Sequence, residues 1–571
     1  MRRETPGRAF RLVPVLLAAL AAFSVYLSST RIYQVDECEN VAMARVLAEG
    51  EQARFLARGD LLAAALSRLE RGPVRARVLF ARARAAMLAV FWLNLILLAA
   101  CTGEDLRTRR GWAALLAAAT LAPLWDYGFE VRHDNPALTG LLLSWYVLRA
   151  RPAGRRSYAA AGFLAAVLPF VAFKALAYVL PLSAVFLAWP PPEHRAPRRA
   201  LAAAWAAGAA AGLASVRLGY GALGLWPAEE AALRWMAGLT AGGAPRFLPG
   251  ETLARLLAQT PLLLALLAAA LVDARRELAR REGAARLWAG DVPETALFAG
   301  ALLLLFANPV PYPYDLLLLV PFGFLAAWRR AVRLADGLLR ERRELVPLAG
   351  ALVLFAHFGP FAAATARHVF WSDARQVRLM DAAEDLTGPA DPVYDGIGLV
   401  PTRPFAAYDW LLHSVNIRSF TNGPGPRVRD QLARDPAPVL IPSYRTDWLG
   451  SRDQAFFARR YVALSDDFRV LGAVLPPGGG RFDVLRAGRY RLSPLSDSGL
   501  GGTVPAADPS CVPARLDGAR VAAGATALSA GTHRLRAPAG CLWAAVWVGP
   551  RLERPPFVGW GDRRRLFVNW Y

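Results

Sequence analysis

Residues 107–156 read RTRRGWAALLAAATLAPLWDYGFEVRHDNPALTGLLLSWYVLRARPAGRR, and their pattern decides the fold. Two apolar runs, 111–126 and 134–150, are joined by a short connector and bounded on both outer sides by arginines. A bilayer core about 30 Å thick requires roughly 20 consecutive apolar residues per spanning helix. Both runs approach that length, so the stretch predicts a pair of helices that crosses a membrane and returns.

Similar apolar runs fill the first two-thirds of the 571-residue chain. The chain is 55% hydrophobic, and its mean hydropathy is +0.28. The first run is too long for a signal peptide and lacks a small-residue cleavage site, so we interpret it as an anchor. We predict eleven membrane-spanning helices, at 11–29, 78–101, 111–126, 134–150, 157–172, 174–189, 199–218, 255–273, 292–307, 313–330 and 345–367.

The formal net charge of +22 is concentrated in alternate short connectors. Arginine clusters occur at 107–110, 149–156, 195–199, 275–286 and 329–343. The intervening connectors 127–133 and 308–314 hold one arginine and none. Because basic short loops face the cytoplasm, the charge predicts membrane topology and no nucleic-acid partner. The N-terminus is expected in the cytoplasm and, with an odd number of spans, the C-terminal third on the opposite side.

The chain is predicted to have three parts. Residues 1–370 form a transmembrane domain whose external loop 31–77 has the apolar spacing of an amphipathic helix on the membrane surface. Residues 371–475 alternate helical stretches with short apolar strands, which is an α/β pattern. Residues 481–571 contain short strands separated by turns, which is typical of a β-sandwich.

The four cysteines bear on the compartment of the C-terminal part. Cys511 and Cys541 both lie there, and an oxidising compartment permits a disulfide between them. Two free thiols are an equally favoured alternative. The sequence contains no CxxC or Cys/His spacing of the kind that binds zinc.

Two acidic segments lie at the predicted outer face. Asp36 and Glu37 follow the first span, and a carboxylate pair there indicates a general base or a cation ligand. The alternative is that they only stabilise the N-terminus of the following helix. Connector 127–133 and Asp134 form the second cluster, although Asp134 also suits a helix start before Pro136. Two acidic clusters at one membrane level favour a site.

Lys174 is the only lysine among 67 lysines and arginines, and it lies in an apolar run. This suggests a position that a guanidinium cannot fill, and a charge within a span indicates a functional site. The alternative is an amine that extends to the interface. Tyr312 and Tyr314 open a later span at the same face, where they could line a site or belong to an aromatic belt.

In order and topology these segments resemble the GT-C superfamily of polyprenyl-phosphate-sugar-dependent glycosyltransferases, especially its bacterial family-39-like and aminoarabinose-transferase-like members. Asp36-Glu37 is similar to the acidic motif of the family's first external loop, and residues 129–134, FEVRHD, match its F-E-x-R-x-D segment. Lys174, in a glycine-led apolar segment, and residues 313–321, PYDLLLLVP, are similar to two later patterns. The resemblance covers about residues 1–370, and no Asp-His-His acceptor signature follows Glu37.

The resemblance implies a polytopic helical GT-C-like fold in the bacterial cytoplasmic membrane. It implies transfer of a sugar from a polyprenyl-phosphate donor to a hydroxyl of a glycan, lipid or protein acceptor, with inversion if displacement is single-step. Asp36 is expected to be the general base, with Glu37 and Asp134 assisting it or holding a divalent cation if one is used. Lys174 and Arg132 are expected to bind the donor phosphate. Further substrate contacts are expected from Glu130, His133, Tyr312 and Tyr314.

Two other classes of function are also compatible with parts of this pattern. A lipid or glycan flippase carries charges within its spans, but it would place polar residues near the bilayer midplane, whereas here they lie at one face. A non-catalytic scaffold for polysaccharide assembly would bind glycans through its β-sandwich. The joint presence of Asp36, Asp134 and Lys174 favours an enzyme.

Overall fold

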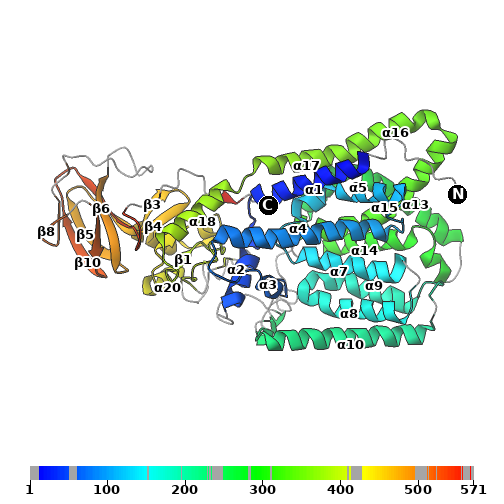
Figure 1. Ribbon diagram of the computed structural model, residues 1–571, viewed down its shortest axis with the longest axis horizontal. Helices are drawn as coiled ribbons and strands as arrows, with labels where there is room; N and C mark the ends of the chain where they lie inside the picture. Colours follow the sequence, from blue (N-terminus) through cyan, green and yellow to red (C-terminus); the bar gives the residue numbers. More distant parts are fainter. Residues whose placement is uncertain are drawn as a thin grey trace.

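The computed structural model consists of a helical bundle and a C-terminal domain (residues 371–571) that contains two β-sheets (Figure 1). The helices of the bundle lie side by side along the long axis of the molecule, and the C-terminal domain follows at one end (Figure 1). The structure describes residues 12–49, 61–150, 153–194, 196–227, 229–230, 233–234, 249–280, 284–308, 311–407, 411–412, 427–495, 511, 514–521, 524–553, 556 and 566–567.

The apolar runs form the helices of the bundle. Each of the eleven predicted spans overlaps at least one helix, since a helix satisfies its backbone hydrogen bonds within one segment and so tolerates apolar surroundings. The helices are α1 (Leu12–Thr30), α4 (Ala76–Cys101), α5 (Arg109–Ala119), α6 (Ala122–Tyr127), α7 (Asp134–Trp145), α8 (Arg155–Val171), α9 (Leu176–Ala188), α10 (Arg198–Ala222), α12 (Gly250–Gln259), α13 (Pro261–Arg280), α14 (Val292–Ala307), α15 (Leu316–Glu341), α16 (Val346–Val353) and α17 (Gly359–Phe370).

Length and hydropathy identify fewer spans than the sequence predicts. Among the described residues, four helices are long and apolar enough to cross a membrane: Leu12–Thr30, Ala76–Cys101, Arg198–Ala222 and Arg343–Phe370. α12 and α13 would together make a fifth, but they meet at 94°. Other predicted spans are shorter helices or are broken, as where α5 is followed by α6, and the long helix α15 carries several arginines in its second half. The prediction of helices is therefore confirmed, and the number eleven stays a prediction.

Small residues allow α8 and α10 to pack closely. A Cβ added to Gly208 of α10 would lie 1.9 Å from the carbonyl oxygen of Ala159 in α8. A Cβ added to Gly162 of α8 would lie 2.0 Å from the carbonyl oxygen of Trp205. Between apolar helices in a membrane the hydrophobic effect gives no driving force, so the helices associate through the van der Waals contacts that such close approach allows. It fixes the course of α8, which leads to Lys174.

The loop predicted to be external, residues 31–77, contains α2 (Val35–Glu49) and α3 (Leu61–Leu66), and α2 differs from its prediction. Ten of its residues are buried, on all sides of the helix, so it is not an amphipathic helix on the membrane surface. It lies between the bundle and the C-terminal domain (Figure 1). Cys38 and Val41 share one hydrophobic core with Ile397 and Leu412 of that domain. Apolar spacing alone could not reveal that a second layer covers the outer face of α2.

Helices and two sheets make up the C-terminal domain. The helices are α18 (Ala374–Leu386), α20 (Val428–Arg434) and α21 (Ser451–Arg460). One sheet has the strand order β1-β2-β4-β11-β6-β9, with β3 paired to β4, and the other has the order β5-β10-β7-β8. The strands are β1 (Val393–Tyr394), β2 (Val439–Leu440), β3 (Tyr461–Ser465), β4 (Phe468–Leu475), β5 (Gly479–Val484), β6 (Gly488–Leu495), β7 (Arg515–Leu516), β8 (Ala519–Arg520), β9 (Ala525–Leu528), β10 (Gly531–Arg536) and β11 (Leu542–Trp547).

The larger sheet crosses the predicted subdomain boundary at 476–480. β4 pairs with β2 at Arg469 and Val470 and with β11 from Gly472 to Leu475, so the α/β part and the later strands share it. β1 and β2 are parallel, and their carboxyl ends therefore lie at the same edge of the sheet. Cys511 and Cys541 form a disulfide, which decides between the two alternatives left by the sequence.

Candidate functional site

The charged residues predicted for the site lie at helix ends or breaks, and the structure brings them together. Asp36 lies in the first turn of α2. Asp134 is the first residue of α7, two positions after Arg132. Lys174 lies in a 3-10 turn between α8 and α9, where Ala172 leaves helical geometry with φ −148° and ψ 116°. From such positions, side chains of different helices can meet at one level.

The cluster is a chain of alternating charges. Arg132 Nη1 lies 2.6 Å from Asp36 Oδ2, and Arg132 Nε lies 3.3 Å from Asp134 Oδ2. Lys174 Nζ lies 2.7 Å from Asp134 Oδ1 and 2.8 Å from Asp315 Oδ1. Charge-assisted hydrogen bonds are shorter and stronger than neutral ones. Each group therefore fixes the position of the next, and the chain ends on Asp315, which the sequence places beside Tyr312 and Tyr314 at the start of a predicted span.

Tyr314 lies against both cations of this chain. Its ring centroid is 3.8 Å from Cζ of Arg132 and 4.3 Å from Nζ of Lys174. Cations are attracted to the face of an aromatic ring. The ring of Tyr312 follows, with 5.1 Å between the two tyrosine centroids. Both tyrosines thus border the charged cluster, which a place in an aromatic belt would not require.

Exposure separates the cluster into two groups. The side chains of Asp36 and Lys174 are 30% and 24% exposed. His133 is also partly exposed, with Nε2 3.8 Å from Asp134 Oδ1. By contrast, Asp134 and Arg132 are buried. Asp36, Lys174 and His133 are thus partly accessible from outside the protein, whereas the buried Arg132 and Asp134 hold them in position.

Glu37 is directed away from Asp36. Its buried carboxylate accepts hydrogen bonds from Arg84 Nε at 2.9 Å and Arg84 Nη2 at 2.7 Å. It also accepts from the backbone N–H groups of Gln34 at 2.9 Å and Val131 at 3.1 Å. Burial works to raise the pKa of Glu37, but Arg84 and these backbone groups outweigh it and lower the pKa. Glu37 therefore joins the start of α2 to α4 and to the connector before α7.

Arg84 and Arg31 are buried arginines that support the site and that sequence analysis does not single out. Arg84 also donates to the carbonyl oxygen of Arg31 at 2.5 Å. Arg31 donates to the carbonyl oxygen of Trp125 at 3.0 Å and forms an ion pair with Glu130. One signal was present in the sequence. Arg84 lies within the apolar run 78–101, and a charge within a span is costly enough to require a partner.

The carboxylates of the cluster pair with arginine and lysine side chains of the protein. Glu130 is buried, with Oε2 3.7 Å from Arg132 Nη1, so it reaches the site through Arg132. Within the part of the chain that the structure describes, no group of three or more His, Cys, Asp or Glu residues could hold a metal ion. Asp36, Asp134 and Asp315 are each paired with an arginine or lysine instead.

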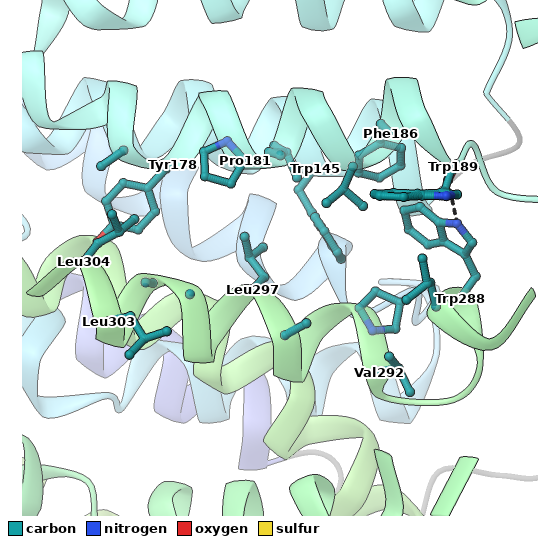
Figure 2. A pocket seen from close by; sticks show the side chains of 18 of the residues that line it. Trp145, Tyr178, Pro181, Phe186, Trp189, Trp288, Val292, Leu297, Leu303 and Leu304 are labelled. Carbon is teal, nitrogen blue, oxygen red and sulfur yellow. Dashed lines mark hydrogen bonds between the residues drawn. The ribbon is translucent and has the colours of Figure 1, made fainter. Parts of the chain in front are cut away.

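An apolar groove begins one helical turn from Lys174. Its volume is about 920 Å³, and residues of α9 and α14 form most of its lining. Tyr178 and Leu304 lie at one end, and Trp189 and Trp288 lie at the other (Figure 2). Trp288 Nε1 donates a hydrogen bond to the carbonyl oxygen of Trp189 at 2.7 Å, which joins the two walls there. The groove is therefore long and apolar, with Lys174 one helical turn from its Tyr178 end and Arg286 in its lining beside Trp288.

Comparison with known proteins finds similarity at the level of structure. No protein-family model matches the chain, and no curated protein matches it. One similar structure is ArnT from Cupriavidus metallidurans bound to undecaprenyl phosphate, with 14% identity and a TM-score of 0.46. The apo state of the same ArnT has 14% identity and a TM-score of 0.43. Each comparison covers 80% of this chain and 97% of the ArnT chain. The chain is thus similar to ArnT in its overall arrangement, at a level that carries no information about its activity.

Proposed function

We propose that this protein is a GT-C-type membrane glycosyltransferase that moves a sugar from a polyprenyl-phosphate donor to an acceptor hydroxyl. The observation that carries the proposal is the position of Lys174 near the end of the apolar groove. A polyprenyl phosphate has an anionic head on a long hydrocarbon chain. The cation and the groove match these two parts, and the exposed Asp36 lies in the same charged cluster.

In this proposal Lys174 binds the donor phosphate, and Arg132 adds a second positive charge from the buried side of the cluster. As the bond from the anomeric carbon to the phosphate oxygen breaks, negative charge grows on the phosphate, and fixed cations stabilise it. Tyr314 keeps both cations in place through its ring. Tyr312 is proposed to contact the substrate beside it.

Asp36 is the proposed general base. The acceptor hydroxyl must lose its proton as its oxygen attacks the anomeric carbon, and Asp36 is the exposed carboxylate of the cluster. A single displacement would invert the anomeric configuration. Asp134 is proposed to orient Lys174 and Arg132, and His133 to contact the substrate. Glu37 and Glu130 are proposed to assist by holding α2 and Arg132, since both are buried and paired.

The proposed location is the outer face of the bacterial cytoplasmic membrane, with the N-terminus in the cytoplasm and the C-terminal domain outside. The alternating arginine clusters support this orientation. The disulfide Cys511–Cys541 supports an oxidising compartment for the C-terminal domain. The acceptor in this location is a glycan, a lipid or a protein.

The proposal is tested by incubating membranes that contain the wild type or Lys174→Met with a panel of polyprenyl-phosphate sugars. Wild type is expected to consume one donor, and Lys174→Met to do so about 10²-fold more slowly, the typical cost of losing one group that stabilises developing charge. Mass spectrometry follows the loss of donor.

Arg110→Met is the control, because Arg110 forms an exposed pair with Asp336 at the other end of the bundle from Lys174. If Lys174→Met does not fold, the double variant Lys174→Met with Asp315→Asn replaces it in the test. The second substitution removes one of the carboxylates that lose their cation in Lys174→Met. Consumption of no donor by folded wild type, with candidate acceptors present, would contradict the proposal and favour a flippase or scaffold.

Filling the groove is expected to weaken the binding of long-chain donors. Gly300 lines the groove, and an added Cβ would meet nothing within 4 Å, so Gly300→Leu places a side chain in the groove without strain. Displacing part of a buried hydrocarbon chain costs about 1.5 kcal/mol or more, which corresponds to about a 10-fold rise in KM. A donor with only two or three isoprene units is expected to keep its KM.

Gly350→Leu is the matched control for the groove. Gly350 also lies in a helix, its added Cβ also meets nothing within 4 Å, and it does not line the groove. Steady-state kinetics with donors of two chain lengths measure the effect. Equal changes in KM for the long and short donors would contradict a role of the groove in binding the chain.

A further inference from the structure

The smaller sheet of the C-terminal domain has one face packed against the core of the domain and one face open to solvent. Phe482 and Val484 of β5 and Leu535 of β10 are buried and belong to that core. Successive side chains of a strand point to opposite faces of its sheet, so the residues that alternate with these three point outward. The sheet lies at the end of the domain farthest from the bundle (Figure 1). Its outer face is therefore exposed and distant from the charged cluster.

Five arginines gather on this outer face. Arg534 of β10 lies directly opposite Arg481 of β5. Arg536, two positions along β10, lies opposite Arg515 of β7, which in turn lies opposite Arg520 of β8. Residues directly opposite one another in an antiparallel pair share a face. All five are exposed, and together they are called the arginine face: Arg481, Arg515, Arg520, Arg534 and Arg536.

The arginine face lacks the carboxylates that arginines elsewhere in the domain have as partners, as Arg486 has Asp391. Among the residues that the structure describes, no carboxylate forms an ion pair with it. Asp483 lies on the same face, but it pairs with Arg460 at 2.9 Å and accepts a hydrogen bond from Thr532 at 2.6 Å. Like charges directly opposite one another destabilise a sheet. The array therefore indicates a role in binding and not in folding.

The arrangement of the arginine face fits an extended anionic chain. Residues two apart on a strand are separated by about 7 Å, and neighbouring strands by about 5 Å. An extended polymer that crosses the strands can therefore meet several positive charges in succession. The five residues form two adjacent rows, with Arg481 and Arg534 in one row and Arg515, Arg520 and Arg536 in the other.

Two other kinds of partner fit this face less well. A lipid surface is bound through apolar side chains as well as basic ones, and the centre of a protein–protein interface is apolar. The large apolar residues of β5 and β10, Phe482, Val484 and Leu535, are all buried. The outer face of these two strands therefore offers charge without an apolar centre.

We propose that the arginine face binds an acidic polysaccharide whose carboxylates pair with the guanidinium groups along an extended chain. A planar guanidinium matches the two oxygens of a carboxylate. The same pairing occurs within the domain, where Arg375 binds both oxygens of Asp467. A glycan is one of the acceptor classes of the proposed function, but binding at this face does not depend on sugar transfer.

Binding is tested with the full-length protein held in phosphatidylcholine nanodiscs. The probe is polygalacturonate, and its fully methyl-esterified form is the control, because it has the same backbone without the charge. Wild type is expected to bind polygalacturonate at low salt and to lose affinity toward about 0.15 M salt, where the screening length is about 8 Å. Equal binding of the esterified polymer would overturn the proposal.

The triple variant Arg515→Gln, Arg520→Gln and Arg536→Gln removes one row of the arginine face. Its Kd for polygalacturonate is expected to rise about 10-fold or more, since each exposed ion pair contributes a factor of about 2 to 5. The matched control replaces three exposed arginines of α20 and α21 in the same domain, as Arg434→Gln, Arg452→Gln and Arg459→Gln. An equal loss of affinity in the control would assign binding to the overall positive charge and overturn the proposal.

Two further measurements separate this role from its alternatives. The triple variant of the arginine face is expected to unfold at an unchanged or higher temperature, because it removes like charges that lie opposite one another. A lower unfolding temperature would give these arginines a structural role and overturn the proposal. Vesicles of phosphatidylglycerol are expected to leave the polymer bound, whereas displacement at equal charge would identify a lipid surface as the partner and overturn the proposal. These results do not depend on donor consumption, so a failure of the proposed function leaves the test of binding intact.

Discussion

Replacing Asp36 by asparagine is expected to lower kcat for sugar transfer by about 10²–10⁴-fold, the usual contribution of a positioned general base. Asparagine keeps the size of the side chain and can still accept a hydrogen bond from Arg132, but it cannot take a proton from the acceptor hydroxyl. Donor consumption and product formation by the purified protein, measured by mass spectrometry, give kcat and KM separately.

The donor KM is expected to remain near the wild-type value in Asp36→Asn, because the phosphate is proposed to bind at Lys174. Asp381→Asn is the matched control: Asp381 pairs with Arg75 at 3.0 Å between α4 and α18, and neither residue belongs to the charged cluster. Transfer by Asp36→Asn at the wild-type rate would remove the central element of the mechanism, even if Lys174→Met is inactive.

Replacing Arg84 by methionine is expected to lower the free energy of unfolding by about 3–5 kcal/mol, since breaking a buried ion pair from one side leaves an uncompensated charge. Arg84 binds both oxygens of Glu37, and it also donates to the carbonyl oxygens of Arg31 and Ile32. Denaturant or thermal unfolding in detergent measures the loss. Arg75→Met is the control, since Arg75 forms exposed pairs worth at most about 1 kcal/mol.

The double variant Glu37→Gln with Arg84→Met is expected to be more stable than Arg84→Met alone, because it removes the carboxylate that the single variant leaves buried and unpaired. A double variant no more stable than Arg84→Met would show that the backbone carbonyls, and not Glu37, are the important partners of Arg84.

The same pair has a pH dependence with a defined sign. The pKa of Glu37 is lowered in the folded protein. Its contribution to stability is therefore present above the pKa of an unfolded glutamate and is lost as the pH falls through the lower, folded value. Unfolding temperatures measured from neutral to acidic pH are expected to fall less steeply in the double variant than in wild type.

The clustering of Lys174, Asp36 and Asp134 could be predicted because such residues are few and unusual, and their roles in a reaction stay a proposal. One lysine lies in an apolar run, and the acidic residues lie in connectors at one predicted face, so the sequence predicts one level for all three. The prediction that α2 lies on the membrane surface was wrong. An apolar stripe on a helix does not show whether a second layer of protein covers the opposite face. The sequence also indicated no partner for Glu37, whose carboxylate turns away from its neighbour Asp36 to reach Arg84.

The sequence by itself determined which segments are helical and which residues share a level along the bundle. Hydropathy and arginine spacing are local properties, and depth along a bundle of parallel and antiparallel helices follows from order along the chain. The tertiary structure alone decided the lateral partners: Lys174 with Asp315, and Glu37 with Arg84. These partners are separated by many residues, and their pairing depends on how each helix is rotated about its axis. That rotation is settled by packing between helices, which no local pattern in the sequence specifies.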